Sequence, residues 1–351
     1  MLNIAHILSS LQVGGAERFV IDLCRSQKSQ GHNPIIISLG RPGEQLESEC
    51  DAHGIIFFST NHSPIFKLIQ VTLQIRAMDI VHVHSPYALK FLQVVAFCLK
   101  GKIIYTRHGA APLIGRLWKN LHVKMQPFIS AITFVSTEGM ENFQNFHQWT
   151  KTPCLVIDNG VLIKTTDFKR ASSEKVHIGS VGRMIPLKNQ FCLLEALTRL
   201  TEEVQKNIVV NFFGDGECST TLKDYRAKNL PNITVNFHGM VNDRENIYAN
   251  MDVLVVCSET EGLSMVIIEA MANKIPVIAT KVGGNPKLVL EQQTGWLFEY
   301  DDNAKLAEII ANIVEDKHIL EPLAEAAFNY INANFSIESS AKKYAQIYEN
   351  N

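Results

Sequence analysis

The chain has 351 residues, a length typical of two domains rather than one. Hydrophobic residues make up 46% of it and charged residues 19%, with 20 Gly and 12 Pro, which excludes a disordered chain and a collagen-like one. The net charge of −2 gives no indication of nucleic-acid binding.

Short β-branched runs alternate with helical patterns along the first half of the chain. The run Asn3–Leu8 predicts a strand, and the apolar spacing after Gly14-Gly15 predicts a helix from Ala16 to about Gln30. Further strands are predicted at Ile35–Leu39, Ile80–His84, Ile103–Thr106, Ile132–Ser136 and Leu155–Ile157.

The alternation restarts at Val176–Val181, which is followed by a glycine turn and a predicted helix at about Asn189–Leu200. Alternating strands and helices predict an α/β protein with two doubly wound, parallel-sheet (Rossmann-like) domains that face a central cleft. The strands expected in the second domain are Ile208–Phe213, Ile233–His238, Val253–Cys257 and Pro276–Thr280.

The domain boundary is expected at the polar stretch Lys164–Lys175. The N-terminal domain then covers 1–163, and the C-terminal domain covers 164–335. An amphipathic helix at 336–351 lies too far from a strand to be a crossover, so we expect it to pack across the join.

Cysteine spacing and hydropathy indicate the compartment. The seven cysteines never approach C-x-x-C spacing, which predicts buried free thiols in a reducing compartment. No apolar run reaches the roughly 18 residues of a membrane span, and the N-terminal segment lacks the basic residues of a signal peptide. We expect a cytoplasmic protein.

The neutral total hides a charge asymmetry. Residues 1–160 contain 14 basic and 10 acidic residues, whereas residues 161–351 contain 19 and 25. The 58 residues from 80 to 137 contain seven bases and no acid. Such segregation favours an anionic partner, although composition alone also produces it on a solvated face.

The segment G-R-M-I-P-L-K-N places Arg183 and Lys188 just beyond the strand Val176–Val181, near the start of a helix. Two cations near a helix N-terminus favour a diphosphate site, because side-chain charge and helix dipole both attract an anion. A surface loop that happens to carry two bases is the alternative.

A second motif, residues 258–280, follows the strand Val253–Cys257. Glu261 lies at the end of that strand, and the turn after it opens a helix whose first amides can bind an anion. Glu269 is eight residues further on, roughly two helical turns, so the two carboxylates can hold two sets of sugar hydroxyls. Glycoside hydrolysis by paired acids is disfavoured, because the turn places phosphate donors beside the first acid.

With these motifs, the sequence resembles glycosyltransferase family 4, whose members are retaining nucleotide-sugar transferases of the GT-B fold. The resemblance covers nearly the whole chain. It rests on GGAER at 14–18, DIVHVHSPYA at 79–88, TRHG at 106–109, FVSTE at 134–138, DNGV at 158–161, GSVGRMIPLKN at 179–189, FFGDGE at 212–217, FHGMV at 237–241, the Glu-x7-Glu block at 261–269 and VGGNPKLV at 282–289.

The resemblance implies roles in binding the donor. Arg183 and Lys188 would bind the diphosphate and stabilise the leaving nucleotide. Glu261 would contact the transferred sugar, and Glu269 the ribose hydroxyls. The other implied donor-binding residues are Gly15, Gly182, Gly214, Met240, Val241, Gly262, Leu263, Ser264 and Met265.

For the first domain, the resemblance implies that His108 reaches the donor sugar as a catalytic residue. His84 and Arg107 would lie on the acceptor side. Histidines at the ends of buried strands are also often purely structural, and for His84 that alternative stays open.

We expect neither a metal nor a cofactor. There is no D-x-D triplet, and Arg183, Lys188 and a helix N-terminus supply the positive charge that a divalent ion would otherwise bring. Among the 12 histidines only His82 and His84 are close in sequence, which does not complete a metal site.

Two positions depart from the family pattern. The usual P-N-G-V-D appears here as Asp158-Asn159-Gly160-Val161-Leu162. The usual G-G-x-P-E ends in Lys287, which replaces an acid with a base near the expected donor pocket.

The segment Ile114–Phe128 combines apolar residues at helical spacing with Arg116, Lys119 and Lys124. It predicts either a basic helix that contacts an anionic membrane or acceptor, or an ordinary crossover helix with a core face.

Together with the resemblance, the sequence predicts a retaining, metal-independent glycosyltransferase with a UDP-hexose or UDP-N-acetylhexosamine donor and a glycan or lipid-linked glycan acceptor. It would act in bacterial surface polysaccharide synthesis, such as that of lipopolysaccharide. A sugar-nucleotide epimerase and a non-catalytic donor-binding subunit are the alternatives.

Overall fold

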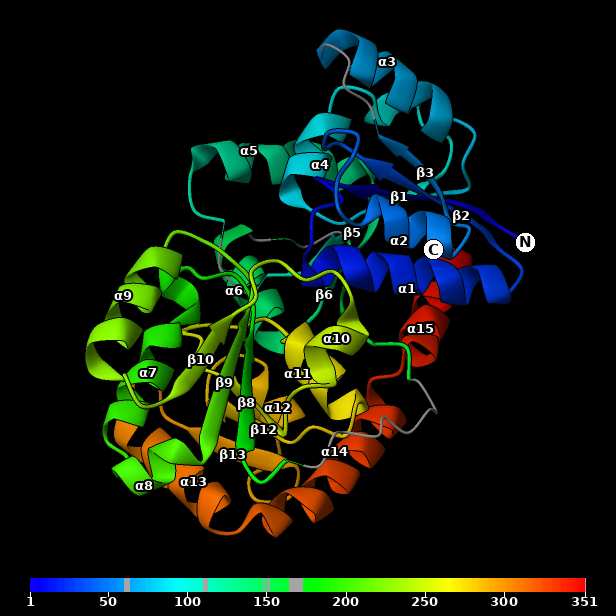
Figure 1. Ribbon diagram of the computed structural model, residues 1–351. Coiled ribbons are helices and arrows are strands. Elements are labelled where there is room, and N and C mark those ends of the chain that lie inside the picture. The colour runs from blue at the N-terminus through cyan, green and yellow to red at the C-terminus, as the bar shows by residue number, and fades with distance from the viewer. Residues whose placement is uncertain (60–63, 110–112, 148, 150–151, 164–172, 351) are drawn as a thin grey trace. The chain divides into compact units, whose positions relative to one another are not determined.

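The computed structural model describes residues 1–351 except 60–63, 110–112, 148, 150–151, 164–172 and 351. The chain divides into two compact units (Figure 1). Unit 1 contains Met1–Leu162 and Ser336–Asn351, and unit 2 contains Ile163–Phe335. Most of the linker expected at 164–175 falls outside the described residues.

Unit 1 is built on a seven-stranded sheet in the order β3-β2-β1-β4-β5-β6-β7. All neighbouring strands run parallel, so each connection crosses over and returns the chain to the same edge. The strands are β1 (Asn3–Leu8), β2 (Asn33–Ser38), β3 (Ile56–Ser59), β4 (Ile80–Val83), β5 (Lys102–Arg107), β6 (Ile129–Phe134) and β7 (Cys154–Val156). The helices are α1 (Gly15–Ser29), α2 (Glu47–Ala52), α3 (Pro64–Ile75), α4 (Pro86–Leu92), α5 (Arg116–Met125), α6 (Thr137–His147) and α15 (Ile337–Asn350).

The C-terminal helix α15 belongs to unit 1, where it packs on α1. Its Tyr344 and Tyr348 side chains are buried. Its N-terminal end is joined to the segment after β7, because Ser336 forms a bridge with Val161 and the Ser340 hydroxyl donates to the Asp158 carbonyl at 2.8 Å. A segment at the end of the chain thus completes the core of the first unit.

Unit 2 repeats the architecture with a six-stranded parallel sheet in the order β10-β9-β8-β11-β12-β13. Figure 1 shows β8, β9 and β10 running side by side in the same direction. The strands are β8 (Val176–Val181), β9 (Ile208–Phe213), β10 (Thr234–Phe237), β11 (Val253–Val256), β12 (Val277–Thr280) and β13 (Gly295–Phe298). The helices are α7 (Gln190–Thr198), α8 (Glu202–Lys206), α9 (Ser219–Asn229), α10 (Arg244–Tyr248), α11 (Met265–Ala272), α12 (Asn285–Leu288), α13 (Asn303–Glu315) and α14 (Leu320–Asn334).

The predicted α/β class with two doubly wound parallel sheets is confirmed. Asn3–Leu8, Val176–Val181 and Ile208–Phe213 form strands with the expected bounds. Only β3 and β13 have no counterpart among the expected strands. Both lie at a sheet edge and are partly exposed, so neither shows the continuous apolar run of a central strand.

The cysteines and the helix lengths bear on the expected compartment. Cys24, Cys50, Cys192 and Cys257 are buried, but the expectation that all seven are buried is wrong, because Cys98 is exposed at the end of a surface turn. None of the described helices has both the length and the apolar character needed to cross a membrane.

Gly160→Ala tests the junction between α15 and the segment after β7. A Cβ at this position would lie 2.3 Å from the Ser336 carbonyl oxygen, so the helix would have to shift. The unfolding free energy of unit 1 should fall by about 2 kcal/mol, the cost typical of overpacking. Urea titration followed by tryptophan fluorescence measures it, in a Trp296→Phe background that leaves Trp118 and Trp149 of unit 1 as reporters. Gly109→Ala is the control, because its Cβ would meet no described atom within 4 Å. Equal stability of the two variants would contradict the close contact.

Candidate active site

Two loops of unit 2 carry Arg183, Lys188 and Glu261, three of the residues predicted to bind the donor. The first follows β8 and leads through the short turn η3 (Pro186–Lys188) into α7. The second follows β11 and leads into α11. Because β8 and β11 are parallel neighbours, both loops leave the sheet at the same edge.

An ion pair joins these two loops. Lys188 Nζ lies 2.6 Å from Glu261 Oε1, and the two side chains are only 24% and 11% exposed. The Ser258 hydroxyl donates to the same carboxylate oxygen at 2.8 Å. Thr280, at the end of β12, donates to the Ser258 carbonyl at 2.7 Å. The orientation of Glu261 is therefore fixed from two sides, while within the described residues its Oε2 accepts no hydrogen bond.

Arg183 differs from Lys188 in that its side chain is exposed and makes no ion pair with any described residue. Its backbone is nevertheless held, because the Gln190 side-chain amide donates to the Arg183 carbonyl at 3.0 Å. A guanidinium has five donors in a planar fork that suits a phosphate group. Arg183 thus offers unneutralised charge beside the Lys188–Glu261 pair.

The glycines of this region allow three loops to pack closely. Gly182 and Gly214 have φ of +146° and +132°, which disfavours any side chain there. A Cβ on Gly214 would lie 2.0 Å from the Gly182 carbonyl oxygen. The Gly214 amide also donates to the Gly239 carbonyl at 2.7 Å. The loops after β8, β9 and β10 are thereby brought together, and Met240 is 47% exposed beside them.

The N-terminal end of α11 is packed against the following loop. A Cβ on Gly284 would lie 2.1 Å from the Gly262 carbonyl oxygen, so the turn at Gly262–Leu263–Ser264 has no room to move towards it. The N-cap Ser264 makes no side-chain cap. The first amides of α11 therefore lack a side-chain acceptor and remain suited to an anion.

Glu269, on α11, is 6% exposed. Its Oε2 accepts a hydrogen bond from the Tyr248 hydroxyl at 2.6 Å. Its Oε1 lies 3.7 Å from Arg244 Nη1, too far for a hydrogen bond, and this buried oxygen accepts none. A buried carboxylate oxygen without a donor is costly, so a hydroxyl brought by a ligand would satisfy it.

In unit 1, Gly15 is the first residue of α1, whose N-cap Gly14 provides no side-chain acceptor. His84 and His108 directly follow β4 and β5, which are neighbouring strands. Nδ1 of His84 lies 3.0 Å from Nε2 of His108, so the structure brings these two predicted residues into direct contact.

Arg107 is 5% exposed, and its guanidinium lies over the Phe143 ring at 5.4 Å from the centroid. Burial lowers the pKa of this guanidinium. The charge of Arg107 thus lies in the interior of unit 1. A role in binding the acceptor stays a prediction.

The described residues contain one cluster with the spacing of a metal site, His6, His82 and His84, whose ligand atoms lie within 4.8 Å of one another. Both nitrogens of each ring already have hydrogen-bond partners, among them Gln27, Thr106 and Tyr348. Since a metal needs unprotonated, unoccupied nitrogens, the cluster does not fit one. His6 comes from the neighbouring strand β1, which the spacing of His82 and His84 could not show.

Several residues of the site were not foreseen from the sequence. Ser258, which orients Glu261, is the first residue of the motif at 258–280 and could have been found by its position. Tyr248 and Arg244 lie in the separate helix α10, and no local pattern links them to Glu269. Lys287 is the base that replaces the family's usual acid. Its Nζ lies 5.9 Å from the centroid of the Phe335 ring, and the Tyr330 hydroxyl donates to its backbone carbonyl.

Two doubly wound units, of which unit 2 carries Arg183 and the Lys188–Glu261 pair at its strand ends, are what a glycosyltransferase of the GT-B class requires. Residues 163–330 match the family described as "Glycosyl transferases group 1", and residues 13–164 match "Glycosyltransferase Family 4". Together the two matches cover 13–330, and the chain belongs to glycosyltransferase family 4.

Individual relatives agree with this family. "GalNAc-alpha-(1->4)-GalNAc-alpha-(1->3)-diNAcBac-PP-undecaprenol alpha-1,4-N-acetyl-D-galactosaminyltransferase" of Campylobacter jejuni is 25% identical over 342 residues, 93% of each chain. "Lipopolysaccharide core biosynthesis glycosyltransferase LpsE" of Rhizobium meliloti is 24% identical over 340 residues, 95% of each chain. The crystal structure of Anabaena HepE in complex with UDP and glucose superposes with a TM-score of 0.85 at 20% identity and covers 99% of each chain, which shows the shared fold.

Unit 1 should lose stability as the pH falls from about 6.5 towards 4. Burial lowers the pKa of His6, His108 and His122 to about 4, whereas in the unfolded chain a histidine titrates near 6.5. Unfolding therefore takes up protons in this window, and each histidine removes up to about 1.4 kcal/mol per pH unit. Urea titrations of the Trp296→Phe protein at pH 7, 6 and 5 measure this slope.

The variant His122→Phe is the matched comparison, because it removes one titrating ring from an aromatic cluster with Phe143 and Trp149. Its slope should be shallower than that of the parent. A stability that does not change between pH 7 and 5 would contradict the neutral, buried state of these histidines.

Proposed function

We propose that this chain transfers a sugar from a UDP-linked donor, a hexose or an N-acetylhexosamine, to a hydroxyl of a glycan or lipid-linked glycan. The anomeric configuration is retained and no metal takes part. The observation that carries the proposal is the Lys188–Glu261 pair beside the exposed Arg183, which pairs with no acid among the described residues, at the adjacent ends of β8 and β11.

The positive charge at this edge of the sheet suits a diphosphate. Lys188 alone brings little net charge, because Glu261 neutralises it at 2.6 Å. Arg183 and the uncapped amides at the start of α11 supply the remainder. In a metal-dependent transferase a divalent ion would supply this charge. Here the chain's own cations stabilise the leaving nucleotide diphosphate.

The carboxylates bind the hydroxyls of the donor. Glu261 directs its Oε2 to the transferred sugar, while Lys188 and Ser258 hold its Oε1. Glu269 uses its unsatisfied Oε1 for the ribose. The exposed Met240 and the adjoining Val241 contact the base. The donor-binding roles expected for Gly15 and His108 of unit 1 stay predictions.

The chemistry of transfer places few demands on side chains. The bond between the anomeric carbon and the diphosphate oxygen breaks, and a bond to the acceptor oxygen forms on the same face of the sugar. The proton of the acceptor hydroxyl passes to the departing diphosphate oxygen. Arg183 and Lys188 stabilise the charge that develops on the leaving group.

The relatives support the classes of donor and acceptor. The Campylobacter enzyme is named for an acceptor linked to undecaprenol by a diphosphate, and the Rhizobium enzyme for lipopolysaccharide core synthesis. HepE binds UDP and glucose. A polysaccharide or lipid-linked acceptor made at the inner face of a bacterial membrane fits both the relatives and the basic character of residues 80–137.

A titration screen against UDP-, GDP- and ADP-sugars tests the donor. Wild-type protein should bind a UDP-sugar, and Arg183→Ala should weaken this binding about tenfold or more, the value of a charged hydrogen bond. Arg199→Ala removes an exposed cation elsewhere in unit 2 and should leave the affinity unchanged. If no nucleotide sugar binds to wild type, the transferase assignment falls. Release of nucleotide and an epimerised sugar in the absence of any acceptor would favour the epimerase instead.

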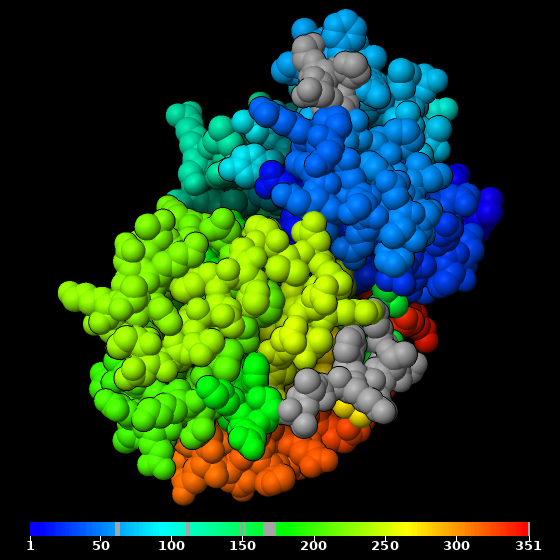
Figure 2. All heavy atoms as spheres, in the orientation of Figure 1, coloured from blue at the N-terminus to red at the C-terminus, as the bar shows by residue number. Residues whose placement is uncertain are grey.

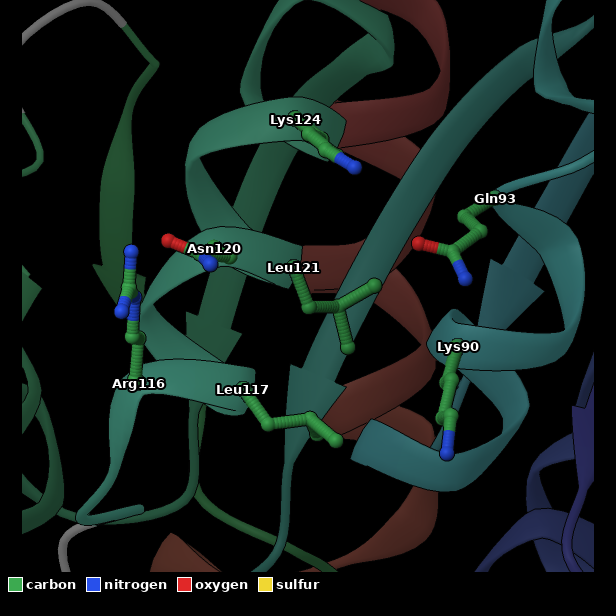
Figure 3. A pocket seen from close by; sticks show the side chains of 7 residues that line it. All are labelled: Lys90, Gln93, Arg116, Leu117, Asn120, Leu121 and Lys124. Carbon is green, nitrogen blue, oxygen red and sulfur yellow. The ribbon is translucent and has the colours of Figure 1, made fainter.

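We further propose that unit 1 contacts an anionic membrane through the groove between α4 and α5. The groove has a volume of about 400 Å³. In Figure 3, Leu117 and Leu121 point from α5 towards α4, where Lys90 faces them, and Lys124 extends over the same side. Arg116 extends from the opposite side of α5.

The exposure of apolar residues beside these cations favours a lipid surface. Leu121 and Met125 are buried as a core face requires, but Leu117 is 54% exposed and Phe97 73%. The helix α3, at the tip of unit 1 in Figure 2, adds further exposed apolar side chains. Basic and apolar side chains together are what binding to an anionic leaflet uses. The exposed apolar residues of α3 are Ile65, Phe66, Ile69 and Leu73.

Co-sedimentation with liposomes tests the membrane contact. Wild-type protein should sediment with vesicles that contain anionic lipid and much less with neutral ones. Charge reversal at the groove, Lys90→Glu with Arg116→Glu and Lys124→Glu, should abolish the difference, because each cation contributes about 1 kcal/mol near an anionic surface. The matched control reverses three exposed cations of unit 2, Arg199→Glu, Lys206→Glu and Lys228→Glu. If both triple variants behave alike, the groove is not the binding surface.

A further inference from the structure

Three histidines of unit 1 are joined in one line of hydrogen bonds. They come from or directly follow the three neighbouring strands β1, β4 and β5. His108 Nε2 lies 3.0 Å from His84 Nδ1, and His84 Nε2 lies 2.9 Å from His6 Nδ1. The rings of consecutive histidines are stacked, with centroids 5.2 and 5.3 Å apart. This line is called the histidine relay below.

The relay ends on Gln27 of α1. His6 Nε2 lies 2.8 Å from the Gln27 side-chain oxygen, which can only accept. On its other side, the amide nitrogen donates to the Tyr348 hydroxyl at 3.4 Å. The Tyr348 hydroxyl also lies 2.7 Å from His82 Nδ1. With the amide in this orientation, the proton on His6 lies on Nε2.

Neutrality then fixes the remaining protons. Burial lowers the pKa of His6 and His108 to about 4 and that of His84 further, so all three rings are neutral near pH 7. A neutral imidazole carries one proton. With Nε2 of His6 protonated, its Nδ1 accepts from His84 Nε2. His84 Nδ1 then accepts from His108 Nε2, which leaves His108 Nδ1 as a bare acceptor.

The bare nitrogen of His108 lies at the weak end of the relay. Its one described partner is the Asn159 side-chain nitrogen at 3.5 Å, a long contact compared with the 2.8 to 3.0 Å of the others. His108 is also partly exposed, whereas His6 and His84 are buried. The end of the relay is therefore the place where a ligand hydroxyl can replace a poor internal contact.

We propose that Gln27, His6 and His84 are positioning residues that hold His108 in a single tautomer and present its Nδ1 as the acceptor for a sugar hydroxyl. This inference rests on the proposed transferase function for the identity of the ligand. The tautomer itself depends only on unit 1. In proteins, the hydrogen-bond partner of one ring nitrogen of a histidine commonly decides which of the two nitrogens carries the proton.

The relay also explains why the end of the chain belongs to unit 1. Tyr348 of α15 orients Gln27 at one end of the relay. At the other end, Ser340 of the same helix holds the segment of Asn159 by its bond to the Asp158 carbonyl. Both ends of the relay are thus anchored by α15.

Nitrogen NMR of protein labelled at histidine tests the tautomer directly, because protonated and bare ring nitrogens resonate far apart. His108→Gln identifies the signals of His108. In wild type, Nε2 of His108 should be protonated and Nδ1 bare. Gln27→Met removes the acceptor without leaving a large cavity, and the His108 signals should then show a mixture of tautomers. A protonated Nδ1 in wild type, or an unchanged spectrum in Gln27→Met, would overturn the relay.

Tyr344→Phe is the matched control. It deletes a buried hydroxyl that bonds Thr106 in the adjoining network but does not touch Gln27. Its His108 signals should match those of wild type. If Tyr344→Phe shifts the tautomer as strongly as Gln27→Met, the effect is general loosening of unit 1 and the relay is wrong.

Ligand titrations separate this inference from the proposed function. A UDP-sugar should move the His108 Nδ1 signal and UDP alone should not, and Gln27→Met should lower kcat/KM for transfer about two- to tenfold with unchanged UDP affinity. Equal shifts with UDP and UDP-sugar, or no shift with either although both bind, would overturn the sugar contact. If no nucleotide binds at all, the proposed function and the sugar contact fail together. The tautomer of His108 in the ligand-free protein then still tests whether the histidine relay exists.

Discussion

The ion pair between Lys188 and Glu261 is the interaction on which the donor side of this molecule depends. It connects the loops after two neighbouring strands at a distance of 2.6 Å in a setting that is mostly shielded from water. Ser258 and the glycine contacts around it hold both loops at the edge of the sheet before any ligand arrives. Because the pair is nearly neutral as a unit, the proposed attraction for a diphosphate comes from Arg183 and the start of α11. Structural support and phosphate attraction are thereby divided between different residues.

In unit 1, the interior holds neutral rings and the positive charge lies mainly on the surface. Its interior contains histidines that burial keeps neutral, together with an arginine whose charge lies over an aromatic ring. Its surface between residues 80 and 137 carries bases without acids. A neutral imidazole has one donor nitrogen and one acceptor nitrogen, so a line of neutral rings has a fixed direction of hydrogen bonding. An imidazolium has two donors and cannot continue such a line. The same unit therefore combines an ordered hydrogen-bond line inside with a basic, partly apolar surface outside.

Much of this architecture could be predicted from the sequence, because central parallel strands are buried on both faces and appear as apolar runs such as Val176–Val181. Arg183, Lys188 and Glu261 could be placed for the same reason, since each lies in the loop that follows such a run. The sequence could not show Tyr248 or His6, which meet Glu269 and His84 only through folding of distant segments. It also did not show that Leu117 is exposed while Leu121 of the same apolar stripe is buried, because the period of a helix does not reveal which part of its face the neighbouring elements cover.

The central claim is that the chain's own cations replace a metal in a transfer that retains configuration. The most direct measurement is proton NMR of the product formed from an α-linked UDP-sugar in the presence of EDTA, with the rate followed in the same sample. The account predicts an α-linked product, formed at the same rate with and without the chelator. A β-linked product, or activity that EDTA abolishes and Mg²⁺ restores, would contradict it.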